Sequence, residues 1–173
     1  MTPHEILGLD LSLSRTGIAM VDGCESVKSK VMGFERLRFI RDEVLAAAGL
    51  RTTVAIIEGY SRGSSQRREE MGELGGIVRV ALHERGVRIV DVAPLSLKKF
   101  AVGDLKPNYR DKDAVLERAR DTLPWDVANH DEADACWLRV IGLHLFGLHG
   151  TELTPWRAEV LEQLQASARG RAA

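Results

Sequence analysis

The stretch EILGLDLSLSRTGIAMV, residues 5–21, decides the fold that we expect for this chain. Apolar residues alternate with small or polar ones over residues 5–13, which is the pattern of a β-strand. A short polar turn at 14–16 then leads to a glycine and an apolar run at 17–21, which indicates a second strand. Asp10 lies near the end of the first strand. The chain therefore begins with two expected strands, the first of which presents an acidic residue.

Working outward, strand patterns come early and then alternate with helical spacing. Residues 53–57 (TVAII) form a β-branched run that ends at Glu58, as expected for a buried strand. This order predicts a mixed α/β sheet with helices on its faces. The last residues, 166–173, are small and charged and are expected to fray. The expected strands are 5–13, 17–21, 26–33, 53–58 and 87–92, and the expected helices are 34–48, 64–85, 94–100, 111–121, 129–149 and one from 154 onward.

Length and composition limit the classes of protein to consider. A chain of 173 residues suits one α/β domain, which we assign to residues 1–150, with a C-terminal helical extension at 151–173. Hydrophobic residues are 45% and charged residues 28%, no apolar run reaches the roughly 18 residues of a membrane span, and the start does not resemble a secretion signal. Cys24 and Cys136 are isolated in sequence and need no disulfide, so we expect a cytoplasmic protein. The net charge of -1 argues weakly against binding nucleic acid by bulk charge, but allows a local basic groove.

Four carboxylates form the candidate chemistry. Asp10 lies within an apolar strand, near its end, and Glu58 closes another, and ligand sites in α/β sheets lie at the carboxyl ends of strands. Asp131 and Asp134 are three apart in an expected helix and share one of its faces. Oxygen ligands without a nearby cysteine favour Mg²⁺ or Mn²⁺. Two such ions, roughly 3.5–4 Å apart, can activate water and stabilise the leaving oxygen in phosphodiester cleavage.

Each of these residues also has a plain structural interpretation. Either strand acid could simply end its strand in a polar loop. Asp131 and Asp134, with Glu132, could be the ordinary acidic first turn of a helix. His130 could orient a water or a metal, or could merely neighbour the helix N-cap. The combination of acids, rather than any one of them, favours a metal site.

Six segments, in order, resemble the RuvC family of Holliday junction resolvases, particularly the small forms carried by bacteriophages. They are GLDLSLSRTGIAMV, AIIEGYSRG, MGELGGIVRVALHERG, VAPLSLKKFAVG, DKDAVLERA and HDEADACWL, and they cover most of residues 5–147. The resemblance implies an RNase H-like fold: a five-stranded mixed sheet, with strand 2 antiparallel and helices on both faces. The family's catalytic, metal-binding acids carry over to Asp10, Glu58, Asp131 and Asp134.

The same resemblance implies a crossover junction endodeoxyribonuclease, active in DNA recombination and repair, that makes paired nicks across a four-way junction. It further implies Mg²⁺, with Mn²⁺ as the alternative, and a homodimer through the helix around Gly72–Arg85. A phage-encoded enzyme of this kind would act in the host cytoplasm.

Basic residues on both sides of the acids are the expected DNA contacts. Tyr60 is the candidate for the family's junction-wedging aromatic, although it lies one position early, and Lys112 resembles a family lysine near the scissile phosphate. The loop before Lys112 reads DLKPNYR where the family has a short glycine-rich loop, a departure that concerns substrate choice. A solvated helix face is the alternative for the arginines beside Glu69 and Glu70. The expected DNA-contacting residues are Tyr60, Arg62, Arg67, Arg68, Lys98, Lys99, Lys106, Arg110 and Lys112.

Three other functions stay open at this point. A branched-DNA or flap endonuclease would use the same acids with less selectivity for structure. A non-catalytic DNA-binding protein could share the fold, although all four acids are present. The turn in GLDLSLSRTG also resembles the phosphate-binding turn of actin-like phosphotransferases, but the chain is short for their two domains and lacks a second glycine-rich nucleotide motif.

Overall fold

The computed structural model describes residues 1–59, 68–103, 111–149 and 153–170. A five-stranded sheet in the order β3-β2-β1-β4-β5 forms its centre. β2 runs antiparallel to β1 and β3, whereas β1, β4 and β5 are parallel. The expected mixed sheet with an antiparallel second strand is therefore confirmed. The strands are β1 (Ile6–Asp10), β2 (Thr16–Ala19), β3 (Cys24–Val27), β4 (Val54–Glu58) and β5 (Arg88–Val92).

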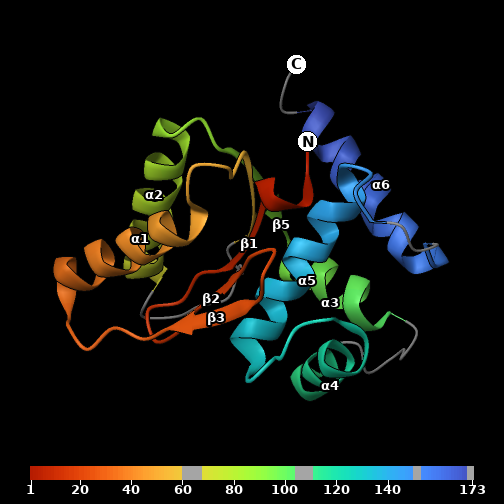
Figure 1. Cartoon of the computed structure of the whole chain (residues 1–173), viewed down its shortest axis with the longest axis horizontal. Helices are drawn as coiled ribbons and strands as arrows, with labels where there is room; N and C mark the ends of the chain where they lie inside the picture. Colours follow the sequence, from red (N-terminus) through yellow and green to blue (C-terminus); the bar gives the residue numbers. More distant parts are fainter. Residues whose placement is uncertain (60–67, 104–110, 150–152, 171–173) are drawn as a thin grey trace.

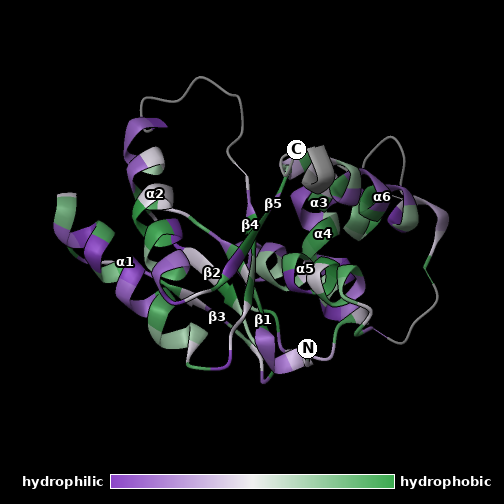
Figure 2. Cartoon of the chain, turned by 90° about the horizontal axis from the view of Figure 1, so that it is seen from above, coloured by the Kyte–Doolittle hydropathy of each residue, from purple (hydrophilic) through white to green (hydrophobic). Residues whose placement is uncertain are grey.

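Helices cover both faces of this sheet (Figure 1). On one face lie α1 (Gly33–Ala48) and α2 (Arg68–Glu84), which pack on alternate strand residues such as Leu9 and Ile57. On the other face α5 (His130–Leu145) packs against residues of the opposite alternation, such as Ile6 and Ile56. Seen from above, the strands pass between the two groups of helices (Figure 2). The second group consists of α3 (Pro94–Val102), α4 (Lys112–Thr122), α5 (His130–Leu145) and α6 (Pro155–Gly170).

Two glycines let α5 lie directly on the sheet. A Cβ atom at Gly8 of β1 would overlap the carbonyl oxygen of Ala135, and one at Gly17 of β2 would overlap that of Asp131. Both overlaps are with helix backbone, which cannot rotate away as a side chain can. Helix α5 can therefore occupy this position only because neither strand residue carries a side chain there.

Several element boundaries differ from those expected. β3 ends at Val27 because its partner β2 begins at Thr16, with which Val27 pairs, so the later residues have no strand to bond. α5 ends at Leu145 rather than near 149, because Gly147 takes a positive φ of 68° and Leu148 N–H donates back to the carbonyl of Leu143. The tail does not fray where expected: α6 continues to Gly170.

The two cysteines are isolated in sequence but not in space. Cys24 of β3 and Cys136 of α5 are free thiols that form a hydrogen bond with each other. The contact lowers the pKa of the Cys24 thiol and raises that of the buried Cys136 thiol. Neither cysteine is in a disulfide, as expected, but their distance along the chain did not reveal that they are neighbours in the fold. None of the helices in the described ranges combines the length and apolar character of a membrane span.

The close contact at Gly17 leads to a stability prediction. Gly17→Ala should lower the free energy of unfolding by about 1–3 kcal/mol, because the added methyl group forces α5 away from β2. Urea unfolding followed by circular dichroism measures this. Gly23→Ala is the matched control, since a Cβ at Gly23 meets nothing within 4 Å. Equal stability of the two variants would contradict the proposed contact.

Candidate active site

Two acids reach the same edge of the sheet from neighbouring parallel strands. Asp10 is the last residue of β1 and Glu58 the last of β4, and the preceding residues Leu9 and Ile57 pair with each other. Because strand side chains alternate, both acids point to the face that α5 covers, opposite to Leu9 and Ile57. Asp10 is only 8% exposed. The structure therefore brings these two sequence-predicted carboxylates together.

The first two turns of α5 carry the other two acids, Asp131 and Asp134. The helix begins at the N-cap Asn129, whose side chain accepts a hydrogen bond from the N–H of Glu132. The backbone of Asp131 lies over Gly17, and Gly17 pairs directly with Asp10 across β1 and β2. Asp134 is buried, whereas the Asp131 side chain remains 33% exposed. All four predicted acids thus lie near the end of β1.

Burial and mutual repulsion make this group electrostatically unfavourable when all its members are ionised. Burial raises the pKa of Asp10 well above its usual value, and the charges of Glu58, Asp134 and Asp131 raise it further. Burial also raises the pKa of Glu58, although its hydrogen bond from Asp10 opposes that shift. The pKa of Asp134 reaches about 7, first through burial and then through the charge of Glu58. Without a metal ion, bound protons therefore neutralise part of the negative charge of these carboxylates, and a bound cation could neutralise it in their place.

The donor set fits a hard divalent cation. Within the described ranges, no three or more His, Cys, Asp or Glu side chains are arranged to hold a metal ion by themselves. The acids nevertheless perturb one another's pKa, and Asp10 hydrogen-bonds to Glu58, so they are close without forming a complete cage. Mg²⁺ is commonly held by one or two carboxylates, with water and substrate phosphates completing its shell. Asp10, Glu58, Asp131 and Asp134 are the residues that could supply those carboxylates, and Asp131 is the more exposed of the two acids on α5.

Two lysines lie within electrostatic reach of the acids. Both Lys98 of α3 and Lys112 at the start of α4 lower the pKa values of Glu58 and Asp134. Lys99, the neighbour of Lys98, instead forms an ion pair with Glu159 of α6. The two adjacent lysines therefore face different surroundings, which sequence reasoning did not distinguish.

The remaining predicted contacts are placed as follows. Arg68 is exposed at the start of α2. The ring of His130 hydrogen-bonds Asp113 of α4 through Nε2, at 2.9 Å from Oδ1, and so joins α4 to α5. A role for His130 toward water or metal stays a prediction. Five predicted DNA contacts lie outside the described residues: Tyr60, Arg62, Arg67, Lys106 and Arg110.

Arg15 is a site residue that sequence reasoning missed. It lies in the turn between β1 and β2, and its Nε is 3.8 Å from Oδ2 of Asp131. Both side chains are about one-third exposed, so the pair is a loose one that solvent screens. Its only signal in the sequence was its position in the turn that follows Asp10. The Arg15 guanidinium adds a positive charge next to Asp131, the acid whose side chain is partly exposed to solvent.

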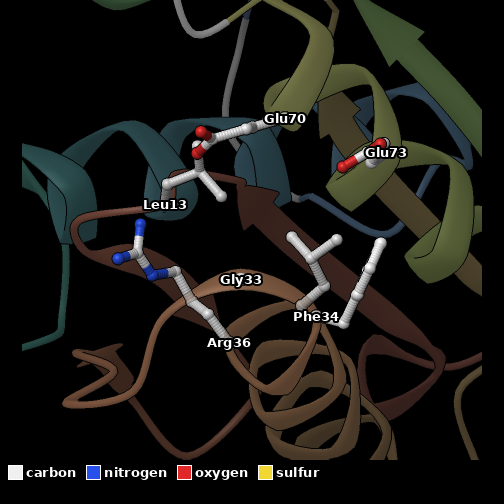
Figure 3. Close-up of a pocket in the computed structure, with 7 residues that line it drawn as sticks. Leu13, Gly33, Phe34, Arg36, Glu70 and Glu73 are labelled. Atoms are coloured by element: carbon white, nitrogen blue, oxygen red, sulfur yellow. The ribbon is translucent and has the colours of Figure 1, made fainter.

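A pocket of about 140 Å³ lies between the starts of α1 and α2, on the face of the sheet opposite to α5, and does not include the acids. It is formed by Leu13 of the β1–β2 turn, Phe34 and Arg36 at the start of α1, and Glu70 and Glu73 of α2 (Figure 3). Phe34 is 81% exposed. Since none of the four carboxylates lines it, this pocket is not the candidate catalytic site.

Comparison with known proteins bears on the fold. No protein-family model matches the chain. A structure of T. thermophilus RuvC in complex with Holliday junction substrate matches with a TM-score of 0.64 and 19% identity, over 83% of this chain and 96% of that one. A second structure of Thermus thermophilus RuvC matches with a TM-score of 0.64 and 20% identity, over the same shares. The chain thus has the RNase H-like fold of RuvC.

The raised pKa of Asp134 predicts how stability depends on pH. The carboxyl titrates at its usual value of 3.8 when the chain is unfolded and at about 7 when it is folded. Its contribution to stability is therefore fully present below pH 3.8 and is lost as the pH rises through 7. In EDTA, Asp134→Asn should be more stable than the wild type at pH 8, by up to roughly 4 kcal/mol.

Urea unfolding between pH 4.5 and 8 measures this difference, which should shrink toward the acid end. The exposed Asp121 provides the control Asp121→Asn, for which we expect no such trend. A wild type that gains stability over Asp134→Asn as the pH rises would refute the assignment.

Proposed function

We propose that the protein is a divalent-metal-dependent endonuclease that resolves four-way DNA junctions. The observation that carries this proposal is the convergence of Asp10, Glu58, Asp131 and Asp134 at one edge of a sheet whose fold matches RuvC. One of the matching structures holds a Holliday junction substrate, which is a property of that protein and supports the choice of substrate here.

In the proposed reaction, a water oxygen attacks a backbone phosphorus and one phosphorus–oxygen bond of the DNA strand breaks. Mg²⁺ or Mn²⁺ bound by the acids would activate that water and stabilise the leaving oxygen. Asp10, Glu58, Asp131 and Asp134 would hold the metal, and the burial of Asp10 and Asp134 keeps bulk water away from the protein side of these acids. Lys98 and Lys112, whose charges act on Glu58 and Asp134, would contact the DNA phosphates next to the metal.

We also propose a homodimer through α2, since coordinated nicks in two strands need two active sites. Gly72, Gly76 and Val80 follow one another at four-residue spacing along an exposed face of this helix. Among the described residues, a Cβ at Gly76 meets nothing within 4 Å, so a side chain there would be tolerated by the packing that the structure describes. The open face would let the helix of a second copy approach closely. Sedimentation velocity tests this, and a monomer at working concentration would contradict paired nicking.

The central test is cleavage of a labelled synthetic four-way junction beside a matched duplex, flap and fork, with Mg²⁺, Mn²⁺ or EDTA. We expect metal-dependent paired nicks that are strongest on the junction. Equal cutting of flaps and forks would shift the role to general branch processing. Tight junction binding without cutting of any substrate would favour a non-catalytic protein, and binding of ATP in its place would favour the actin-like alternative.

Asp10→Asn should abolish cleavage while leaving junction binding intact. The substitution keeps the shape of the side chain but removes the charge that a divalent cation requires. Junction binding is measured by gel shift in EDTA, and cleavage in a parallel series with Mg²⁺. Retained Mg²⁺-dependent nicking by a clean preparation would remove Asp10 from the site.

Lys98 and Lys99 provide a matched pair for the proposed DNA contacts. Lys98→Ala should weaken junction binding and reduce the slope of log affinity against log salt by about 0.9, the value for one lost phosphate contact. Lys99→Ala should leave that slope unchanged, because Lys99 is paired with Glu159. Binding titrations over several salt concentrations measure both. Equal slopes for the two variants would show that their different surroundings do not matter for DNA.

A further inference from the structure

Glu132 is a buried carboxylate in the first turn of α5 that the proposed chemistry does not use. It is 6% exposed and lies between Asp131 and Asp134 in sequence. Its Oε1 accepts hydrogen bonds from Ser26 Oγ at 2.8 Å and from Asn129 Nδ2 at 2.6 Å, and its Oε2 accepts one from the N–H of Ala128 at 2.8 Å. A buried charge with three donors is satisfied where it lies, and is thereby held there.

These bonds convert a local helix cap into a contact between elements. Asn129 is the N-cap and Glu132 the third helical residue, which is the spacing of a capping box. In the usual box the acid returns only to the backbone at the N-cap. Here its backbone donor is Ala128, one residue before the N-cap, and the acid also accepts from Ser26 on the edge strand β3. Asn129 Nδ2 donates to the same Ser26 hydroxyl at 3.1 Å. The start of α5 is thus fastened to the sheet as well as capped.

The register of the sheet shows what this attachment holds in place. Asp10 pairs with Gly17, and Gly17 pairs with Ser26, so the three residues form one row across β1, β2 and β3. The backbone of Asp131 lies over Gly17 in the middle of this row. Glu132 is fixed at one end of the row, by Ser26, and the candidate catalytic Asp10 lies at the other.

The acids themselves oppose this arrangement. The backbone of Asp131 lies over Gly17, the partner of Asp10, and ionised carboxylates brought this close repel one another. Apolar packing of α5 on the sheet opposes this repulsion, and so do polar contacts at the start of the helix. The bonds of Glu132 lie one residue from Asp131 and are attractive.

We propose that Glu132 is a positioning residue, whose bonds to Ser26, Asn129 and Ala128 hold Asp131 and Asp134 beside Asp10 and Glu58. The importance of Glu132 for catalysis rests on the proposed nuclease function, whereas its role in holding the start of α5 on the sheet does not depend on that function. Partners that orient metal-binding carboxylates through hydrogen bonds typically change metal affinity by 10–100-fold when they are removed.

Three variants test the proposal on the full chain. Glu132→Ala removes all three bonds, and Ser26→Ala removes the one to β3. Glu132→Gln keeps the side-chain volume and two of the three bonds, because its amide nitrogen is itself a donor and cannot accept the third. Glu25→Ala, an exposed acid on the same strand as Ser26, is the matched control. The readouts are Mn²⁺ affinity from the electron paramagnetic resonance signal of the free ion, the hydrogen exchange rates of α5, junction binding, and the Mg²⁺ concentration that gives half-maximal cleavage.

We expect Glu132→Ala to weaken Mn²⁺ binding at least tenfold and to raise the half-maximal Mg²⁺ concentration, with junction affinity within about threefold of the wild type. Exchange should accelerate at residues 130–137 but not in β4. Glu132→Gln should recover most of the loss, and Glu25→Ala should behave as the wild type.

Unchanged Mn²⁺ affinity and unchanged exchange of α5 in Glu132→Ala and Ser26→Ala would overturn the proposal. So would faster exchange in all strands alike, which would indicate general destabilisation. If Glu132→Ala does not fold, Ser26→Ala and Glu132→Gln decide the matter. If the wild type cuts no branched DNA, the proposed function fails, while Mn²⁺ binding and exchange still decide whether Glu132 positions the acids.

Discussion

The approach of the α5 backbone to β1 and β2 is the contact on which the candidate site depends. Gly8 and Gly17 have no side chains, and the carbonyl groups of α5 occupy the space that a Cβ would need. A thicker layer between helix and sheet would move Asp131 and Asp134 away from the strand acids. The closeness that packs the core on this face therefore also gathers the carboxylates. One steric constraint serves both stability and the proposed chemistry.

This closeness has an electrostatic cost that the rest of the structure must offset. Buried carboxylates raise one another's pKa, and the group is most stable when it shares protons or meets a cation. The apolar face under α1 and α2 carries no comparable group among the described residues, and its core is continuous from strand to helix. The two faces therefore differ: the face under α1 and α2 is a hydrophobic layer, whereas the face under α5 combines a hydrophobic core with a group of carboxylates that repel one another when ionised.

Much of this could be predicted from the sequence, because local periodicity determines it. The β-branched run of β4 predicted that Glu58 closes a strand, and three-residue spacing placed Asp131 and Asp134 on one helical face. Alternation over residues 5–13 placed Asp10 in the first strand, which ends at Asp10 rather than at residue 13. Whether these residues perform catalysis was not decided by spacing and stays a proposal. The antiparallel second strand followed from the family resemblance rather than from periodicity.

What escaped prediction depends on contacts between distant segments. The contact between Cys24 and Cys136, the pairing of Lys99 with Glu159 and the bonds from Glu132 to Ser26 all join elements whose relative placement no local pattern encodes. Glu132 is the most instructive case, since its position in a helical first turn predicts a solvated acid. It is buried because the glycines in β1 and β2 allow α5 to lie so close to the sheet that Glu132, at the start of the helix, contacts Ser26 of β3. The same close packing that assembles the acids therefore created the place where a further carboxylate could hold them.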